Sequence, residues 1–426
     1  MAILADPTPD LLAMPRFDDG TIDMQELLRR LAEQVVNAVM DAEADQLCGG
    51  GANSRNGYRE RSLATCVGTL ALRIPKLRTG SFFPDDVIER YQRVDRALVA
   101  AVAEMYATGT STRKVQRIAE KMGVSRLSKD QVGSIASSLD ADIDELCGRP
   151  LDGSPVPYIW LDATCVKCRR EGRVASTAVV TAIGCDAGGW RRVLGVGVVD
   201  TESYDSWLAF LRGVRDRGVA GVQLAVSDAH PGLVRALGEV FQGAAWQRCA
   251  VHLMRDCMRE AGSWRLRRRV GRILSPVFRG RDAATVTAMY HVACDMLEAC
   301  CPRAAAILEE AEPDALAHLD FPPSHWKRLR TNNVQERTNR EIKHRSRVVQ
   351  VFPSIKSLVR LGGAVMCEQD ELWQESRYFS EARMDEPCDD KRAHGVDGPV
   401  DWTRLEAEAR KMIESGLELA DRVEAA

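Results

Sequence analysis

The chain contains 426 residues, of which 45% are hydrophobic and 28% charged, and its formal net charge is −3. A chain of this length is expected to form two or three domains with buried cores. Its apolar runs stay well short of the roughly 18 residues that a membrane-spanning helix needs, so no membrane partner is expected. Thirteen cysteines without a secretory signal indicate a reducing cytoplasm rather than a disulfide framework.

The charge is distributed unevenly along the chain. Residues 253–281 hold nine Arg and two acidic residues, and residues 326–350 hold eight Lys or Arg and two Glu. After Met366 there are seventeen acidic and eight basic residues. The near-neutral average therefore conceals two basic segments, which favour local phosphate binding, and an acidic C-terminal end.

The N-terminal region is expected to hold a loose arm, one helix and a basic strand pair. Apolar residues recur at helical spacing from 24 to 47. Two short alternating segments, 55–61 and 68–78, indicate the strand pair. We expect Arg55 and Arg59 in this pair to contact backbone phosphates.

Three short helices are predicted next, at Ala97–Ala107, Ser111–Met122 and Ser128–Leu139. Ser111 and Ser128 are suited to be N-caps, and Gly109 and Gly123 fall where helices end. Three helices joined by tight turns are typical of a helix-turn-helix module, whose last helix enters a major groove. The alternative is a small bundle that packs against the next domain, because the last helix is poor in Arg and Lys.

The central region predicts an α/β domain. Strands are expected at Tyr158–Asp162, Ser176–Gly184, Arg192–Val199, Gln223–Ser227 and Ala244–Arg248, with helices at Tyr204–Arg217 and Pro231–Phe241. Three successive strands, a helix and a fourth strand follow the order of a ribonuclease H-like sheet. Asp162 and Asp228 then lie at the ends of the first and fourth strands.

A third carboxylate, Glu336, lies in what is predicted to be an Asn-capped helix start. Glu336 shares one helical stripe with Arg340, Lys343 and Arg347, at spacings of four, seven and eleven residues. The buried stripe of this helix is predicted to hold Val334, Thr338 and Ile342. Two carboxylates from strands and one from a helix are suited to hold two divalent cations, and hard oxygen ligands favour Mg²⁺, with Mn²⁺ as a possible substitute.

Several motifs resemble those of the Mutator-type transposases of bacterial insertion sequences, which belong to the DDE recombinase group. The motifs are Arg55-Asn56-Gly57-Tyr58-Arg59, Gly109-x-Ser111-Thr112-Arg113, Leu161-Asp162-Ala163, Ser227-Asp228-Ala229-His230-Pro231-Gly232-Leu233, Cys249-x-x-His252 and Asn332-Asn333-x-x-Glu336-Arg337-x-Asn339-Arg340, running on to Phe352-Pro353. They cover roughly residues 25 to 375.

The resemblance implies that Asp162, Asp228 and Glu336 are the catalytic and metal-binding triad, with His252 beside them. It implies double-stranded DNA as the partner, both the terminal inverted repeats of a mobile element and the target. It also implies at least a homodimer in the active complex, and activity in the cytoplasm at the bacterial nucleoid. Cleavage and strand transfer are expected to proceed by two phosphoryl transfers that depend on two Mg²⁺ ions.

Charge and position extend the set of expected DNA contacts beyond Arg55 and Arg59. The further residues are Arg113, Arg267, Arg268, Arg269, Arg337, Arg340, Lys343 and Arg347. The expected domains are an N-terminal arm, helix and strand region (1–92), a helical DNA-binding module (93–150), the first part of the catalytic core (151–252), a helical insertion (253–325), the last catalytic helices (326–375) and an acidic C-terminal tail (376–426).

Several alternatives remain open at this level. Cys165 and Cys168 together with Cys249 and His252 have a spacing suited to zinc. His252 alone has two further roles open to it, contact with the scissile phosphate or orientation of Asp228, against a core histidine satisfied by a neighbour. The whole chain has two rival functions, a structure-specific nuclease on the same fold and a domesticated, non-catalytic DNA-binding protein.

Overall fold

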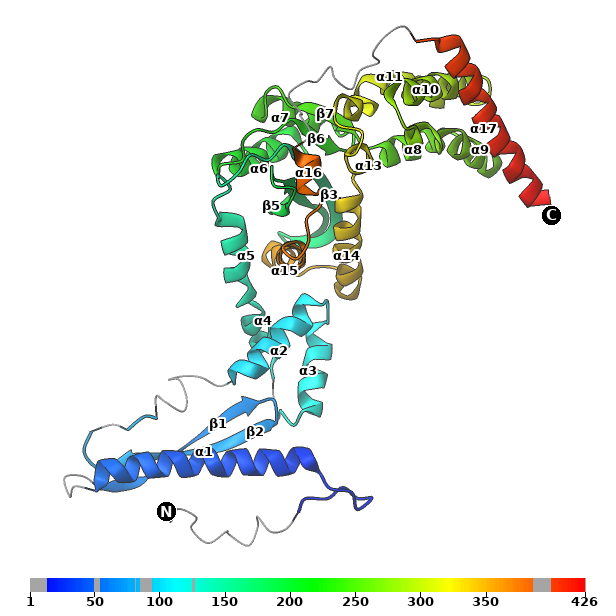
Figure 1. Ribbon diagram of the computed structural model, residues 1–426. Helices are drawn as coiled ribbons and strands as arrows, with labels where there is room; N and C mark the ends of the chain where they lie inside the picture. Colours follow the sequence, from blue (N-terminus) through cyan, green and yellow to red (C-terminus); the bar gives the residue numbers. More distant parts are fainter. Residues whose placement is uncertain are drawn as a thin grey trace. The chain divides into compact units, whose positions relative to one another are not determined.

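The structure of the protein is a computed structural model that describes residues 14–49, 54–80, 82–84, 94–124, 127–385 and 400–425. Contacts divide the chain into two compact units, Met1–Ala141 and Asp142–Ala426 (Figure 1). The arm predicted at the N-terminus lies largely outside the described residues. Within the described residues, no helix combines the length and apolar character needed to cross a membrane.

The first unit contains a hairpin and a group of short helices. Helix α1 (Met24–Cys48) packs against the antiparallel strands β1 (Arg55–Thr65) and β2 (Gly68–Leu77), as the sequence predicts. Their shared core contains Met40, Leu63, Leu70, Leu72 and Ile74. Helices α2 (Arg96–Ala107), α3 (Thr112–Lys121) and α4 (Lys129–Ala136) build a second small core with Ala64 of β1.

The predicted helix boundaries in this unit are confirmed except at the end of the third helix. The Ser111 and Ser128 side chains accept hydrogen bonds from the first turns of α3 and α4. Gly109 and Gly123 have positive φ after α2 and α3. The third predicted helix, however, ends at Ala136 rather than at Leu139, because the Ser137 and Ser138 hydroxyls donate to nearby backbone carbonyls and compete with the helix. A further helix, α5 (Leu139–Gly148), follows.

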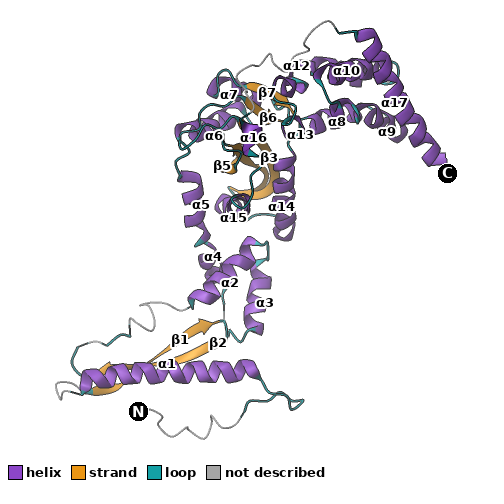
Figure 2. Ribbon diagram, viewed as in Figure 1, coloured by secondary structure: helices purple, strands orange, loops and turns teal. Residues whose placement is uncertain are grey.

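The second unit is built on a five-stranded sheet of order β5-β4-β3-β6-β7 (Figure 2). Its strands are β3 (Tyr158–Arg170), β4 (Arg173–Cys185), β5 (Arg191–Val199), β6 (Leu224–Ser227) and β7 (Ala245–Arg248). The first three are antiparallel to one another in sequence order, whereas β6 and β7 run parallel to β3. The mixed α/β architecture agrees with the sequence prediction.

Helices cover both faces of this sheet. Alternation along β3 sends Ile159 and Leu161 to one face, where α6 (Tyr204–Asp216) and α7 (Pro231–Val240) pack. Tyr158 and Trp160 point to the other face, which is covered by α14 (Asn333–Val349) and α15 (Ile355–Trp373). Asp162 has the same parity as Trp160 and therefore belongs to the α14 face.

The β3–β4 hairpin is longer than predicted, because β3 does not end at Asp162 but continues to Arg170, and β4 begins at Arg173 rather than at Ser176. The extension pairs residue by residue with β4 down to Arg170 and Arg173. Glu171 and Gly172 close the hairpin with positive φ at both positions, which is the backbone of a two-residue turn matched to strand twist. Asp162 therefore lies within a long hairpin and not at a strand end.

Between β7 and α14 the chain is helical, as the sequence predicts, and we call this segment the helical body. Its main helices are α8 (Ala250–Arg259), α9 (Trp264–Leu274), α10 (Ala283–Glu298) and α11 (Pro302–Glu310), followed by the short α12 (Glu312–Ala315) and α13 (Trp326–Leu329). Residues 402–425, assigned from the sequence to an acidic tail, form α17 (Trp402–Ala425). Ala409 and Ile413 of α17 belong to the core of the helical body.

A segment after α15 packs against the turn between β4 and β5 at Gly189. The backbone N–H groups of Tyr378 and Phe379 both donate to the Gly189 carbonyl, and α16 (Glu381–Met384) follows. Gly189 has a φ of +81°, and a β-carbon there would collide with the carbonyl of Phe379. No side chain fits this position.

We predict that Gly189→Ala lowers the free energy of unfolding by about 2 to 4 kcal/mol, through backbone strain and displacement of the segment after α15. Gly172→Ala is the matched control, because its φ is +80° but a β-carbon there meets open space. The control is expected to cost about 1 kcal/mol. Urea unfolding of both variants measures the difference, and equal losses of stability would contradict the close approach at Gly189.

Candidate active site

Asp162 in β3 and Asp228 directly after β6 lie level with each other, because the two strands are parallel neighbours. Tyr158, Ile159 and Trp160 of β3 pair with residues 66 positions later in β6, namely Leu224, Ala225 and Val226. The two aspartates have the same offset, so they follow the paired segment at the same height. Asp162 is 8% exposed and Asp228 is half-buried.

Burial dominates the electrostatics of Asp162. Desolvation, reinforced by the nearby charge of Asp228, raises the pKa of the Asp162 carboxyl to about 7. Two hydrogen bonds act in the opposite direction, from the Ala163 N–H to Oδ1 at 2.9 Å and from Asn339 Nδ2 to Oδ2 at 2.8 Å. Negative charge on both Asp162 and Asp228 is therefore unfavourable, and a bound cation would stabilise the two carboxylates.

Three amide side chains fasten the start of α14 to the central strands. Asn332 Nδ2 donates to the Leu161 carbonyl at 2.9 Å, and Gln335 Nε2 donates to the Trp160 carbonyl at 2.8 Å. With Asn339 they occupy positions i, i+3 and i+7, which is one face of a helix. Asn332 stands at the N-cap position but makes no capping hydrogen bond, so the predicted Asn cap is wrong: the side chain is used against β3 instead.

The far end of α14 is fastened to the same strand. Phe352 N–H donates to the Lys167 carbonyl, and Arg169 N–H donates to the Phe352 carbonyl. At 1.5 Å per residue the helix covers about 25 Å. The strand from Leu161 to Lys167 covers about 20 Å. The two lengths are similar, so α14 packs along the part of β3 that extends beyond Asp162.

Glu336 therefore has a fixed position near the aspartates, in the first turn of α14. Its Oε1 lies 3.0 Å from Arg255 Nη1 of α8, at an angle that gives no hydrogen bond. Glu336 is thus paired with a cation of the helical body rather than joined to the aspartates. In the part of the chain that the structure describes, no three His, Cys, Asp or Glu side chains come together closely enough to hold a metal ion.

The Cys249-x-x-His252 motif joins three elements at this site. Cys249 N–H donates to the Ser227 carbonyl at the end of β6, and the buried Cys249 Sγ accepts from Asn332 N–H at 3.3 Å. His252 follows in the first turn of α8 and is half-buried, and its Nδ1 has no hydrogen-bond partner among the described residues. The cysteine is thus structural, whereas the histidine has a ring nitrogen that is buried without a partner among the described residues.

The chain is similar to known transposases. The family model for the Mutator family of transposases matches residues 10–376. A transposase of insertion sequence element IS1081 from Mycobacterium tuberculosis is 41% identical over 366 residues, which are 83% of this chain and 87% of that protein. The transposase of ISRM5 from Rhizobium meliloti is 37% identical over 380 residues, 87% of this chain and 92% of that protein.

The chain belongs to the Mutator family of transposases. A third relative, the transposase of IS256 in transposon Tn4001 from Staphylococcus aureus, is 36% identical over 326 residues, 75% of this chain and 82% of that protein. The sequence-based family assignment is confirmed, and DNA is the partner on which such an enzyme acts.

The structure argues against a zinc site at Cys165 and Cys168 of this transposase. Residues three apart on a strand point to opposite faces. Cys168 is buried in the core on the α14 face, whereas Cys165 is exposed and its Sγ lies 3.5 Å from Glu202 Oε1. The two thiols lie on opposite faces of the sheet, so they cannot ligate one ion unless β3 is rearranged. His230, the other histidine of the motifs, accepts from Leu233 N–H and caps α7.

The cations of α14 that are expected to contact DNA lie on its exposed face. Arg337, Arg340, Lys343 and Arg347 are exposed. The buried face holds the predicted Val334, Thr338 and Ile342, but it also holds polar residues that the apolar pattern does not reveal: Gln335, Asn339, Arg345 and Ser346. Arg345 is neutralised by Glu341 and Glu368.

The other expected DNA contacts differ in how freely they are presented. Arg59 and Arg113 are exposed. Arg55 is instead engaged within the first unit, because its guanidinium pairs with Asp41 and Asp45 of α1 at 3.0 and 2.6 Å. This pairing already satisfies the charge of Arg55, so a structural role accounts for its position.

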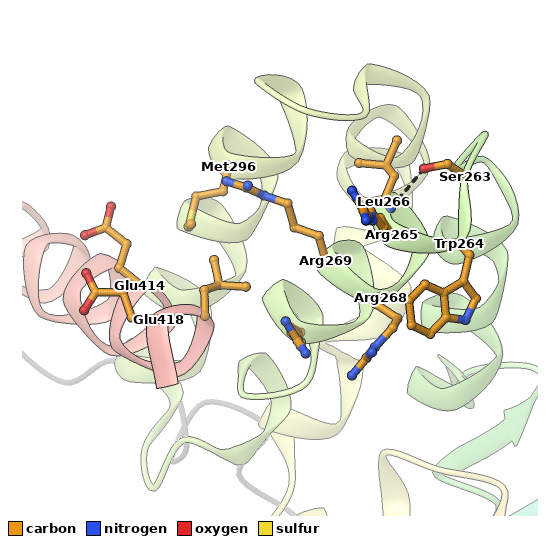
Figure 3. Close-up of a pocket in the computed structure, with 11 residues that line it drawn as sticks. Ser263, Trp264, Arg265, Leu266, Arg268, Arg269, Met296, Glu414 and Glu418 are labelled. Atoms are coloured by element: carbon orange, nitrogen blue, oxygen red, sulfur yellow. Dashed lines mark hydrogen bonds between the residues drawn. The ribbon is translucent and has the colours of Figure 1, made fainter. Parts of the chain in front are cut away.

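The arginines of α9 line one side of a groove of about 1060 Å³ in the helical body (Figure 3). Arg265, Arg268 and Arg269 come from α9, and Glu414 and Glu418 of α17 face the same groove from the opposite side. Arg267 points elsewhere, since its Nε donates to the Met258 carbonyl. The sequence shows the arginines but not the carboxylates that the fold brings opposite them.

Two residues of the site were missed by the sequence analysis. Asn339 belongs to a recognised motif, yet only the folded structure shows that it contacts Asp162. Arg255 lies three residues after His252, one helical turn along the same face, and its partner Glu336 is 81 positions away. That helical spacing is the one signal by which Arg255 could have been found.

The raised pKa of Asp162 makes a prediction about stability and pH in the absence of divalent metal. A carboxyl whose pKa is higher in the folded state than in the unfolded state binds its proton more tightly when folded. Its contribution to stability therefore decreases as pH rises from about 4 to about 7, and then levels off.

We expect the melting temperature of the unsubstituted protein, taken relative to Asp162→Asn, to fall by on the order of a few degrees between pH 5 and pH 8. Thermal melts of both proteins in chelator-treated buffers measure this difference. A difference that stays constant with pH would contradict a protonated, buried Asp162.

Proposed function

We propose that this transposase is a metal-dependent enzyme of the DDE type, in which Asp162, Asp228 and Glu336 serve a ribonuclease H-like catalytic core. The observation that carries the proposal is the fastening of α14, with Glu336 in its first turn, directly onto the strand that bears Asp162. Three antiparallel strands followed by two parallel ones, with helices on both faces, support the fold assignment.

The residues present fit divalent cations. The donor set consists of carboxylate oxygens, the kind that Mg²⁺ and Mn²⁺ prefer. Glu336 Oε1 and Asn339 Oδ1 are both buried without a hydrogen-bond partner among the described residues. Asp162, Asp228 and Glu336 would hold the ions, provided that Glu336 exchanges its ion pair with Arg255 for a cation. Two bound ions would stabilise the attacking and leaving oxygens of a phosphodiester.

The protein's own groups have separate tasks in the proposed reaction. Asn339 orients Asp162 through its hydrogen bond to Oδ2. Arg255, once released from Glu336, and His252 of the same helix are the proposed contacts of the scissile phosphate. Water first cleaves a strand at the end of the element and leaves a 3′-OH. That hydroxyl then attacks a phosphodiester of the target and displaces its 3′ oxygen.

Binding and assembly belong to other parts of the chain in this proposal. The helices α2 to α4 of the first unit are proposed to read the terminal inverted repeats, and the exposed cations of α14 are proposed to hold the phosphates near the cut. Joining two ends requires at least a homodimer in the active complex. The bacterial nucleoid is the proposed place of action.

Asp162→Asn, Asp228→Asn and Glu336→Gln are each expected to abolish Mg²⁺-dependent cleavage and joining, while end binding stays within about threefold of the unsubstituted protein. Affinity comes from cations elsewhere, whereas these carboxylates serve the metal. Gel-shift and strand-transfer assays on one end substrate separate the two properties. Near-normal joining by any of the three variants would remove that residue from the triad, and cleavage without joining by the unsubstituted protein would favour a nuclease.

Replacement of Arg267, Arg268 and Arg269 by Ala is expected to weaken DNA binding for all sequences alike. The slope of log affinity against log salt should flatten by up to about 0.9 for each phosphate that the protein no longer neutralises. Arg303→Ala is the control, because Arg303 is an exposed arginine of the same helical body, 86% exposed and 3.9 Å from Glu260. An unchanged slope together with a lower melting temperature would show that the cluster is structural.

A further inference from the structure

A second group of arginines lies outside the proposed catalytic centre, where the edge strand β5 meets the segment after α15. Its members are Arg191 and Arg328. Arg191 Nε is buried without a hydrogen-bond partner, and neither guanidinium has a carboxylate partner in the described part of the chain. Burial lowers the pKa of Arg191, and the charges of Arg328 and of Arg337 on α14 lower it further.

Aromatic rings hold these two arginines in place of carboxylates. The Arg191 guanidinium lies 4.5 Å from the centre of the Tyr378 ring and 4.8 Å from that of Trp373. Arg328 lies 4.8 Å from the same Tyr378 ring and 5.0 Å from that of Phe379. A cation over an aromatic face is attracted without being neutralised, so both arginines keep their charge and their donors.

Two arginines close to Arg191, Arg149 and Arg192, differ from it because each is paired with an aspartate. A cavity of about 380 Å³ lies beside Arg191, lined also by Trp190, Trp373 and Gln374. Its other guanidinium groups are compensated, since Arg149 pairs with Asp370 at 2.5 Å and Arg192 pairs with Asp186 at 2.9 Å. Arg191 thus brings an uncompensated positive charge to the wall of this cavity, whereas Arg328 lies on the far side of the Tyr378 contact and is not among the lining residues.

The aromatic rings tie this pair of arginines to the proposed catalytic strand. Tyr378 packs edge-on against Trp160 of β3, with ring centres 5.6 Å apart. Trp160 precedes Asp162 by two residues, which is about 7 Å along a strand. The arginines therefore stand beside the proposed centre without belonging to the carboxylate cluster.

We propose that Arg191 and Arg328 form a binding site for a backbone phosphate of the DNA strand that passes the active site. The site would hold the DNA one or two nucleotides from the phosphodiester that reacts, and it would act on any base sequence. This inference rests on the proposed function only in taking DNA cleavage to occur at Asp162, since the phosphate site itself needs no metal.

The test uses the full-length protein and an end-containing duplex in a buffer without divalent metal. The Arg191→Gln, Arg328→Gln double variant is expected to bind about tenfold more weakly and to flatten the slope of log affinity against log salt by about 0.9, the value for one neutralised phosphate. A random duplex should show the same weakening, because phosphate contacts carry no sequence information.

Arg377→Ala is the matched control. Arg377 lies over the Trp190 ring at 5.3 Å in the same region, but it is already paired with Glu381 at 2.7 Å, so its replacement should leave the salt slope unchanged. If the double variant does not fold, Arg328→Gln alone is measured. Arg328 is only half-buried, so this single replacement is compatible with folding, and it should still flatten the slope.

A folded double variant, or a folded Arg328→Gln variant, that binds with unchanged affinity and slope overturns the site, as does weakening confined to one DNA sequence. These outcomes are independent of the carboxylate variants. Should Asp162→Asn still cleave while the arginine variants show the flatter salt slope, the catalytic assignment fails and the phosphate site stands.

Discussion

The contact on which this structure depends is the one between α14 and β3. A row of side-chain amides, Asn332, Gln335 and Asn339, is buried between helix and strand, where an apolar stripe would be the usual solution. Hydrogen bonds fix translation and rotation of a helix more narrowly than apolar packing does, because each donor must meet one acceptor. The position of Glu336 relative to Asp162 follows from this directional contact.

The features that could be predicted from the sequence depend on interactions between residues close together in the chain. Ser111 and Ser128 are recognisable because a cap bonds to a backbone group three residues away. Asp228 follows a short apolar run that is a strand in the structure. The family motifs bring the three carboxylates into one hypothesis, and the family itself is confirmed.

The features that could not be predicted depend on contacts between residues that are far apart in the chain. The extension of β3 to Arg170 depends on β4 and on Phe352, so the segment around Cys165 reads on its own as a possible metal motif. The pairing of Arg255 with Glu336 and the meeting of α17 with α9 arise only when separate segments are folded together. The same holds for charge, since acidic and basic segments that cancel in the composition face each other across one groove.

The long hairpin has a second consequence, which concerns protection of a sheet edge. β6 pairs with β3 only as far as Trp160, so beyond it the odd-numbered residues of β3 direct their backbone groups toward an edge that β6 does not cover. Leu161, Lys167 and Arg169 use those groups for Asn332 and Phe352, at the two ends of α14. An uncovered strand edge is a template for pairing with another chain. The contacts at the two ends of the helix that carries Glu336 thus also occupy backbone groups that would otherwise be offered to another strand.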